Sequence, residues 1–371
     1  MTGLLLAAAL VLTPADPAPV GMSAEGLARA AALLEAETAS GRVQAASLLV
    51  ARDGKVVLHK GFGKAQPDTI FLLASITKPV TACALMLLVE RGQVSLADPA
   101  QRYLPEFTGG ARAEIRVRDL LSHISGMPDM LPENTALRRA NAPLSAFVKG
   151  ALQTPLLYRP RTDFQYQSMG ILLAAEIVER VTKLRLRDFE KREIFDKLGM
   201  KNSFLGMGGR KIEETAWCQT GRSNPEDLRL FGANGLYWRD MGHPWGGMHS
   251  TTTDLAILLQ TFLNGGSYGA VRLFSPATVA AMTRDQNEGL QAPWGLGWGL
   301  ATSRVWAYFG DLASPRTFGH SGATGTVAWA DPERRLLCVI LTTRPSGEDN
   351  GRLLRLVSNA VSASVGTEPR P

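Results

Sequence analysis

The spacing of hydrophobic residues near the N-terminus predicts an amphipathic helix over residues 24–40. Leu27, Ala30, Ala31 and Leu34 recur every three or four positions, which places them on one face of a helix. Ser23 stands directly before this pattern and is a candidate N-cap, while Gly41 follows it. A helix that buries one apolar face is therefore expected at the start of the folded chain.

The spacing then shortens to that of strands. In "AASLLVARDGKVVLHKGFG", apolar residues lie on both sides of Asp53-Gly54, a residue pair that favours a tight turn between antiparallel strands. Strand patterns return only near the end of the chain, in "TFGHSG" and in "GTVAWADPERRLLCVILTTR", which turns at Asp331-Pro332. A closing helix is predicted in "GRLLRLVSNAVSASV".

The middle of the chain, roughly residues 80–215, has helical spacing. Helices are predicted in "VTACALMLLVERG", "VRDLLSH", "LSAFVKGALQ" and "MGILLAAEIVERVTKLRLRDFEKREIF", divided by proline-rich breaks. This order predicts an α+β fold, with an antiparallel sheet flanked by helices and an inserted all-helical domain. We expect a tail over residues 1–20, a discontinuous sheet domain over 23–79 and 216–365, and a helical domain over 80–215.

The tail carries an apolar stretch from Leu4 to Leu12, followed by prolines and alanines. Its length suits the apolar region of a signal peptide and is too short to span a bilayer. A positively charged segment before it is missing. We expect an exported protein, periplasmic or secreted, with no stable membrane span in the mature chain; a cytoplasmic protein with a disordered tail is the alternative.

Composition narrows the classes of function. Hydrophobic residues make up 45% and charged residues 20% of the 371 positions, as in an ordinary soluble globular protein. The net charge of +6 is spread along the chain, and its densest basic patch, which begins at Lys183, also contains acids, so a nucleic-acid partner is not expected. Cys83, Cys218 and Cys338 are far apart, which favours buried free thiols, and the five histidines show no zinc spacing. We expect no metal and no cofactor.

Candidate chemistry appears in "LLASITKPVTACALMLL", where Ser75 and Lys78 stand three apart at the start of an apolar run. Residues three apart share a face of a helix. A buried lysine without a charged partner tends to lose its proton, and a serine hydroxyl needs a neighbouring base to become a nucleophile. An ordinary capped helix with an extended lysine stem is the alternative reading of this pair alone.

Two further stretches occur in a fixed order after this pair. "FQYQSMG" places Tyr166 and Ser168 just before an apolar helix, and "TFGHSGATG" ends a strand at His320, Ser321 and Gly322. With Ser75-x-x-Lys78, these motifs make the chain resemble the serine β-lactamase and penicillin-binding-protein superfamily. The similarity is greatest to the branch of class C β-lactamases, soluble D,D-peptidases and esterases.

The resemblance implies an α/β/α sandwich with the active site between the sheet and the helical domain. It implies that Ser75 becomes acylated and that Lys78 and Tyr166 move the protons, for which Tyr166 needs a lowered pKa. The backbone N–H groups of Ser75 and Ala323 would form the oxyanion hole. The substrate would be held by four residues: Ser168, His320, Ser321 and Gly322.

The sequence departs from the family's motifs at two of these positions. Ser168 replaces an asparagine and offers fewer hydrogen bonds. His320 replaces the lysine of β-lactamases, and a histidine is mostly neutral at pH 7, so it holds a β-lactam carboxylate less strongly. Arg304 or Arg316 could supply the missing charge.

Other candidate sites are weaker. "GHSGA" nearly matches the nucleophile elbow of α/β-hydrolases, but Ala323 breaks the pattern and no histidine follows His320. "SHISG", residues 122–126, is interpreted as a structural turn. Trp294 and Trp298 are interpreted as packing residues.

These observations predict a metal-independent serine hydrolase that works through an acyl-enzyme on a small-molecule or peptide substrate with a reactive carbonyl. Esters, D-amino-acid amides and β-lactams are candidates, and weak β-lactamase activity is expected. The alternatives are an efficient class C-type β-lactamase, a transacylase and a non-catalytic penicillin-binding sensor.

Overall fold

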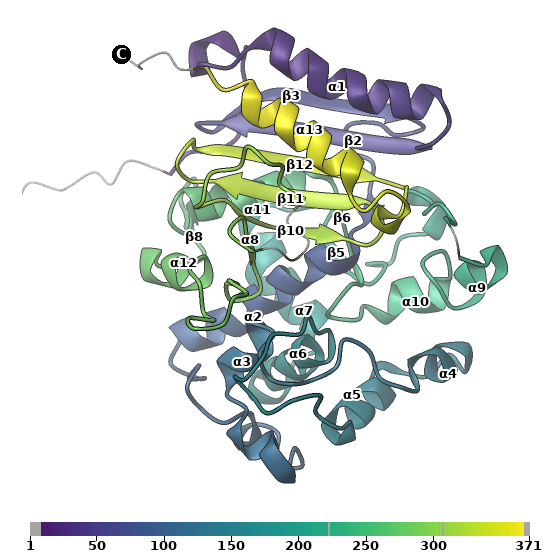
Figure 1. The fold of residues 1–371 in the computed structure, drawn as a ribbon, viewed down its shortest axis with the longest axis vertical. Helices are drawn as coiled ribbons and strands as arrows, with labels where there is room; N and C mark the ends of the chain where they lie inside the picture. The colour runs from purple at the N-terminus through teal and green to yellow at the C-terminus, as the bar shows by residue number, and fades with distance from the viewer. Residues whose placement is uncertain (1–8, 222, 304, 306–307, 367–371) are drawn as a thin grey trace, which may run out of the picture.

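The computed structural model describes residues 9–221, 223–303, 305 and 308–366. Its main feature is a seven-stranded sheet in the order β1-β3-β2-β12-β11-β10-β9, in which every neighbouring pair is antiparallel except β1 and β3. Strands from both ends of the chain therefore meet side by side in the centre, as Figure 1 shows for β2 and β12. The predicted α+β fold with an antiparallel sheet flanked by helices is confirmed.

The elements have the following bounds. The strands are β1 (Thr13–Pro14), β2 (Ala45–Arg52), β3 (Lys55–Gly63), β4 (Phe71–Leu72), β5 (Phe204–Leu205), β6 (Met248–Ser250), β7 (Ser267–Tyr268), β8 (Val271–Arg272), β9 (Gly299–Leu300), β10 (Phe318–Gly322), β11 (Thr326–Asp331) and β12 (Leu336–Thr342). The helices are α1 (Ala24–Ala39), α2 (Thr77–Glu90), α3 (Val117–Leu121), α4 (Asn134–Arg139), α5 (Leu144–Gln153), α6 (Met169–Thr182), α7 (Leu186–Glu190), α8 (Asp196–Leu198), α9 (Pro225–Leu230), α10 (Leu236–Met241), α11 (Thr252–Leu263), α12 (Pro276–Met282) and α13 (Arg352–Ala363).

The first helix and hairpin form as the hydrophobic pattern predicts. The Ser23 side chain accepts a hydrogen bond from the Gly26 N–H and caps α1. Asp53 and Gly54 connect β2 to β3 with φ values of 55° and 74°. Positive φ at both central residues is the geometry of the tight hairpin turn that suits twisted strands.

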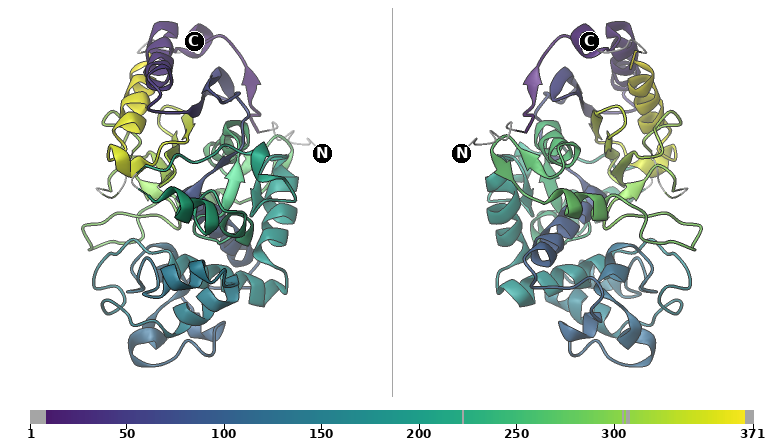
Figure 2. Two further views of the ribbon diagram at one scale, coloured as in Figure 1. Left: turned by 90° about the vertical axis from the view of Figure 1, so that its right-hand side faces the viewer. Right: turned by 90° about the vertical axis from the view of Figure 1, so that its left-hand side faces the viewer.

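The sheet separates two hydrophobic cores, because alternate residues of a strand point to opposite faces. In β2, Leu48 and Val50 belong to the core under α1 and α13, whereas Leu49 and Ala51 belong to the core on the other face. Helix α11 packs on that second face, and Figure 2 shows α1 and α13 together along the opposite side. The arrangement is a three-layer α/β/α sandwich.

Most of the predicted helical middle is helical, with one break that the pattern does not indicate. The segment 169–195 divides at Lys183, which has a φ of 60° and ends α6 in a left-handed turn. A π-helix, Lys191–Phe195, then follows α7. Strand β5 lies inside residues 80–215 yet pairs with β6, so the proposed boundary at residue 215 stays a prediction.

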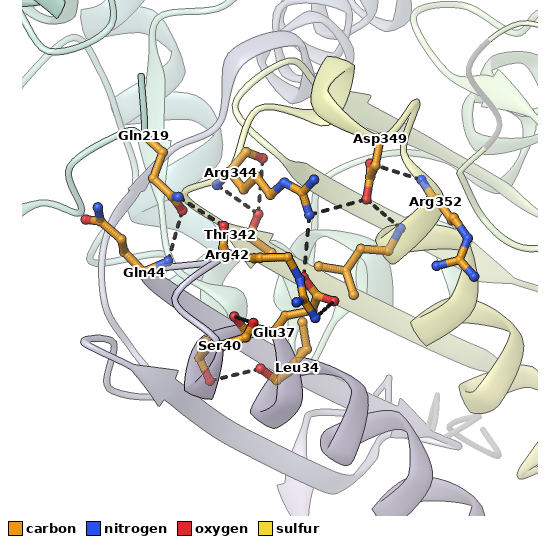
Figure 3. A network of polar contacts seen from close by, with 12 residues as sticks. Leu34, Glu37, Ser40, Arg42, Gln44, Gln219, Thr342, Arg344, Asp349 and Arg352 are labelled. Atoms are coloured by element: carbon orange, nitrogen blue, oxygen red, sulfur yellow. Dashed lines mark hydrogen bonds and ion pairs between the residues drawn. The ribbon is translucent and has the colours of Figure 1, made fainter. Parts of the chain in front are cut away.

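A polar network ties the loop after β12 to α1 (Figure 3). The Arg344 guanidinium lies 3.5 Å from the Glu37 carboxylate and 3.8 Å from that of Asp349, and Glu37 also pairs with Arg42. The same loop donates the Ser346 N–H to the carbonyl of Ala323 at 3.0 Å. The network therefore anchors the loop that supports the turn between β10 and β11.

The predicted export segment falls partly outside the described residues, since the structure begins at residue 9. Thr13 and Pro14 pair with β3, so the second half of the expected tail adds a short strand to the sheet. Within the described ranges, no helix is both long and apolar enough to cross a membrane. The predicted buried free thiols are found at Cys83, Cys218 and Cys338.

Candidate active site

Ser75 lies in a short 3₁₀-helix, Ala74–Ile76, that leads directly into α2. Ala74 has a φ of 50°, a conformation that is costly for a residue with a Cβ and that is often found at functional sites. The Thr77 hydroxyl fixes this bend, because it donates to the Ala74 carbonyl at 2.7 Å and accepts the Met248 N–H at 3.0 Å. The bend leaves the Ser75 side chain partly exposed at the start of a buried helix.

Lys78 lies one turn further along, and only 1% of it is exposed. Its ammonium group donates to the Ser75 hydroxyl at 3.1 Å and to the Trp245 carbonyl at 3.0 Å. Burial lowers the pKa of Lys78 to about 7, against the opposing effect of the Asp129 carboxylate. A large fraction of Lys78 is therefore neutral near pH 7. This agrees with the expectation from the sequence that a buried lysine tends to lose its proton.

Tyr166 lies in the loop before α6 and is buried beside this pair. The Lys78 nitrogen is 4.7 Å from the centre of its ring. Burial raises the pKa of Tyr166 above its usual value, and a hydrogen bond with Ser75 opposes this effect. The expectation of a lowered Tyr166 pKa is therefore wrong: burial penalises the phenolate, and the charge that could stabilise it is itself reduced when Lys78 loses its proton.

His320 reaches the same centre from strand β10, and 3% of it is exposed. Its ring lies 6.0 Å from that of Tyr166. Its Nδ1–H donates to the Ser321 carbonyl at 2.7 Å, so Nε2 is the unprotonated nitrogen. Burial and the Lys78 charge lower the pKa of His320 to about 3. His320 is thus neutral at every physiological pH. The sequence alone predicted only a mostly neutral histidine at this position, where β-lactamases have a charged lysine.

The turn after β10 lies against the segment that precedes Ser75. The Thr324 hydroxyl donates to the Leu72 carbonyl at 2.8 Å, and the Thr326 hydroxyl donates to the Leu73 carbonyl at 2.9 Å. Gly322 is required at this approach, since a Cβ there would lie 2.1 Å from the Leu73 carbonyl oxygen. These contacts hold the turn that contains Ala323 against Leu72 and Leu73, directly before the short helix of Ser75. The oxyanion hole expected from the N–H groups of Ser75 and Ala323 stays a prediction.

Sequence reasoning missed Asp129. The Ser168 hydroxyl donates to the Asp129 carboxylate at 2.7 Å, so the only hydrogen that Ser168 could offer a substrate is already donated within the chain. The Asp129 charge acts on both Lys78 and Tyr166 and favours the protonated form of each. Asp129 follows a proline in an irregular loop, and no motif marks it.

His123 is a second missed residue, although its stretch was singled out as a turn. It does form a turn, with a φ of 64°, but its fully buried ring also lies 4.6 Å from that of Tyr166. Trp294, expected to be a packing residue, lies between the two histidines at 5.0 Å from His123 and 5.8 Å from His320. Trp298 packs in the core against Phe262, as expected.

The structure does not place either Arg304 or Arg316, the two arginines that could replace the positive charge missing at His320, in the site. Arg304 lies outside the described residues, and Arg316 is an exposed residue of the loop before β10. Among the described residues, no group of three His, Cys, Asp or Glu side chains has the arrangement of a metal site. The site therefore combines a partly exposed hydroxyl, a buried amine of lowered pKa, a buried phenol and a neutral imidazole.

Comparison with known proteins agrees with these motifs. The family model described as Beta-lactamase matches residues 30–361. A Salmonella gallinarum protein, provisionally named a D-alanyl-D-alanine carboxypeptidase, is 31% identical over 376 residues, covering 90% of this chain and 86% of the relative.

Two solved structures share the fold. The hydrolase EstCE1, described as having promiscuous acyltransferase activity, has a TM-score of 0.74 and 21% identity, covering 91% of this chain and 99% of its own. The D-amino acid amidase of Ochrobactrum anthropi has a TM-score of 0.69 and 22% identity, covering 90% and 98%. The family match over most of the chain, with a relative that aligns almost end to end, means that the chain belongs to the beta-lactamase family of serine hydrolases.

Proposed function

We propose that Ser75 is the nucleophile of an acyl-transfer hydrolase and that Lys78 is the base that activates it. The observation that carries this proposal is the buried Lys78 amine, 3.1 Å from the Ser75 hydroxyl and with a pKa lowered to about 7. A neutral amine at that distance can take the hydroxyl proton while the serine oxygen attacks a carbonyl carbon.

Acylation would proceed in two steps. The bond from Ser75 Oγ to the carbonyl carbon forms, the hydroxyl proton passes to Lys78, and negative charge collects on the former carbonyl oxygen. The backbone N–H groups of Ser75 and Ala323 would donate to that oxygen. The bond to the leaving group then breaks, and the proton moves from Lys78 through the Tyr166 hydroxyl to the leaving atom.

Deacylation would reverse these steps with water. The water oxygen attacks the acyl carbon, its proton passes to the Tyr166–Lys78 pair, and the bond to Ser75 Oγ breaks as Ser75 recovers its proton. In this proposal Tyr166 acts as a neutral relay, which agrees with its raised pKa. No step requires a phenolate as a stable species.

Esters and amides are the proposed substrates, with β-lactams turned over weakly. A β-lactam carboxylate would meet the unprotonated Nε2 of His320 where a lysine would present a cation. The names of two relatives support a peptide or a D-amino-acid amide, since one is named a D-alanyl-D-alanine carboxypeptidase and the other a D-amino acid amidase. EstCE1, described as a hydrolase with acyltransferase activity, supports acyl transfer without naming the bond that is cleaved.

A substrate panel on purified protein tests the proposal. It should contain short-chain p-nitrophenyl esters, nitrocefin and D-Ala-D-Ala peptides, with Ser75→Ala as the control. We expect ester turnover, weak nitrocefin hydrolysis, and an acyl adduct on Ser75 by intact-protein mass spectrometry. Equal labelling of Ser75→Ala protein by a fluorophosphonate would refute the assignment. Burst acylation without turnover would favour a penicillin-binding sensor, and nitrocefin hydrolysis far above that of any ester would favour a β-lactamase.

A transacylase is the second candidate, favoured by the reported acyltransferase activity of EstCE1 and by the partial exposure of Ser75. An added alcohol would then attack the acyl-enzyme in place of water. The test is product analysis with methanol present: a methyl ester formed faster than the free acid supports transfer, and acid alone excludes it.

We also propose export, on the basis of the apolar stretch from Leu4 to Leu12. N-terminal sequencing of the protein from its native host tests this. Loss of about the first 20 residues is expected, and an intact Met1 on a cytoplasmic protein would refute it.

A further inference from the structure

Three polar groups near Tyr166 present hydrogen-bond acceptors. The first is the partly exposed Asp129 carboxylate. The second is the Ser168 hydroxyl, whose only hydrogen is donated to Asp129 at 2.7 Å, so that its free valences are lone pairs. The third is Nε2 of His320, which is unprotonated, buried and without a hydrogen-bond partner among the described residues.

This polarity is the reverse of that expected for binding an anionic group. An asparagine at position 168 would offer two donors, and a lysine at position 320 would offer a cation. In this chain the side chains at both positions accept hydrogen bonds instead, and the Asp129 carboxylate is hydrogen-bonded to Ser168. His123 has the opposite polarity: its Nδ1 accepts the Gln167 N–H at 3.3 Å, so its buried Nε2 carries the hydrogen and is one donor beside these three acceptors.

The negative charge of Asp129 also favours a cationic group on the substrate. Asp129 lies close enough to act on the protonation of Lys78 and Tyr166. When Lys78 has lost its proton and can act as the base, Asp129 is left without that positive charge beside it. A buried or half-buried anion in that state is stabilised by a cation that arrives with the substrate.

We propose that the preferred substrate carries a protonated amine on its acyl group, next to the scissile carbonyl, and that Asp129 and Ser168 bind this ammonium. His320 accepts a hydrogen bond from a neutral donor of the same substrate. This proposal rests on the proposed function and names its substrate class: esters and amides of amino acids with a free amino group. A free carboxylate near these acceptors is excluded by repulsion from Asp129.

A matched pair of substrates isolates the ammonium. D-Alanine p-nitroanilide and isobutyric acid p-nitroanilide have nearly the same size, but the second carries a methyl group in place of the ammonium. The L-enantiomer is included so that the hand of the substrate does not decide the result. The measured quantity is the ratio of the two kcat/KM values.

The expected ratio in the native protein is about tenfold or more in favour of the amino substrate, the order of one charge-assisted hydrogen bond. Asp129→Asn should lower this ratio about tenfold. The ratio is the quantity to measure, because loss of the Asp129 charge also lowers the pKa of Lys78 and so changes kcat/KM for both substrates alike. Glu133→Gln is the control, because it removes an exposed charge of the same sign four residues away. Raising the pH past the pKa of the substrate amine, about 8 for an α-amino group, should also remove the preference.

One result would overturn the proposal. A ratio unchanged in Asp129→Asn means that Asp129 does not bind the ammonium. If kcat/KM then changes equally for both substrates, Asp129 acts only through the pKa of Lys78.

Binding provides a test that does not depend on turnover. Calorimetry on Ser75→Ala protein should show tighter binding of D-alaninamide than of isobutyramide, and Asp129→Asn in that background should abolish the difference. If Ser75 is acylated by esters but these ratios do not depend on Asp129, only this inference fails. If no reagent acylates Ser75, the proposed function fails, and the calorimetry still decides whether the ammonium is bound.

Discussion

Two fully buried cations, Lys78 and Arg239, show how differently one fold treats a charge in its interior. Arg239, in α10, donates to the Ala233 carbonyl at 2.6 Å and to the Ala216 carbonyl at 2.9 Å. It also donates to the Asn234 side chain at 3.2 Å and to the Thr215 hydroxyl. Lys78 donates to one carbonyl and to the hydroxyl of Ser75.

The number of acceptors separates a structural cation from a reactive one. A guanidinium cannot lose its proton in a protein, so its burial is tolerated only where acceptors surround it. An amine can lose its proton, so a site with few acceptors leaves it poised between two states. Burial lowers the pKa of both groups, but it brings only that of Lys78, at about 7, into the physiological range.

Exchanging the reactive cation for a permanent one should have the largest effect. Lys78→Arg keeps the charge but removes the base, and kcat/KM for p-nitrophenyl esters should fall roughly 10²–10⁴-fold, the usual contribution of a positioned acid–base group. Lys55→Arg, at the exposed first residue of β3, is the control. Near-normal esterase activity of Lys78→Arg would mean that Lys78 is not the base.

Removing the structural cation should destabilise the fold. Arg239→Met leaves the carbonyls of Ala216 and Ala233 and the Asn234 side chain without their donor, and we expect a loss of about 3–5 kcal/mol in the free energy of unfolding. Denaturant titration measures it, with the exposed Arg229→Met as the control. A change below about 1 kcal/mol would show that these acceptors find other donors.

The pH dependence sharpens the difference. Because Lys78 must be neutral to act, kcat/KM for a neutral ester should rise about tenfold per pH unit below 7 and level off above it. His320 does not contribute over that range, since its pKa is about 3. Asp129→Asn should shift the midpoint to lower pH, since the carboxylate favours the protonated amine. A rate that falls between pH 6 and 8 would contradict this assignment.

The free energy of unfolding should also depend on pH through Lys78, and it should rise with pH. The pKa of Lys78 is about 7 in the folded protein, whereas the ordinary pKa of a lysine is 10.5, so the unfolded chain binds more protons between these two values. The contribution of Lys78 to the free energy of unfolding therefore rises with pH from about 7 to about 10.5. Lys78→Met should flatten this rise and increase the thermal midpoint at pH 7, because it removes the cost of a buried amine. An unchanged pH profile in Lys78→Met would refute the linkage.

The smallest expected effect concerns a cation introduced at position 320, where the native residue is a neutral histidine. His320→Lys would provide a charge-assisted hydrogen bond to a β-lactam carboxylate, and nitrocefin kcat/KM should rise about tenfold relative to ester kcat/KM. The ratio of the two substrates is the measurement. If the ratio is unchanged, another group already holds the carboxylate.

The local pattern of the chain was sufficient for the long strands and several of the helices, but it did not predict the short strands β1 and β4 to β9. Helix α1, the hairpin at Asp53-Gly54 and the strands β10 to β12 form where spacing and turn residues predict them. The break at Lys183 was not predictable, because a lysine in a left-handed turn carries no sequence signal comparable to that of glycine.

The residues of the candidate site also divide into those that the sequence identified and those that it missed. Ser75, Lys78, Tyr166 and His320 stand in short motifs and could be named from the sequence. Asp129 could not, because it enters the site from an irregular loop whose course is set by packing.

The sequence by itself determined the long strands and several helices, the family resemblance and the identity of the groups that could perform acyl transfer. These properties depend on neighbours along the chain and on side-chain chemistry. The tertiary structure decided the protonation and polarity of those groups: that Lys78 has few acceptors, that Tyr166 has a raised pKa, and that Ser168 and His320 accept hydrogen bonds. Burial and hydrogen-bond direction depend on residues that are distant in the sequence, so only the folded chain can set them.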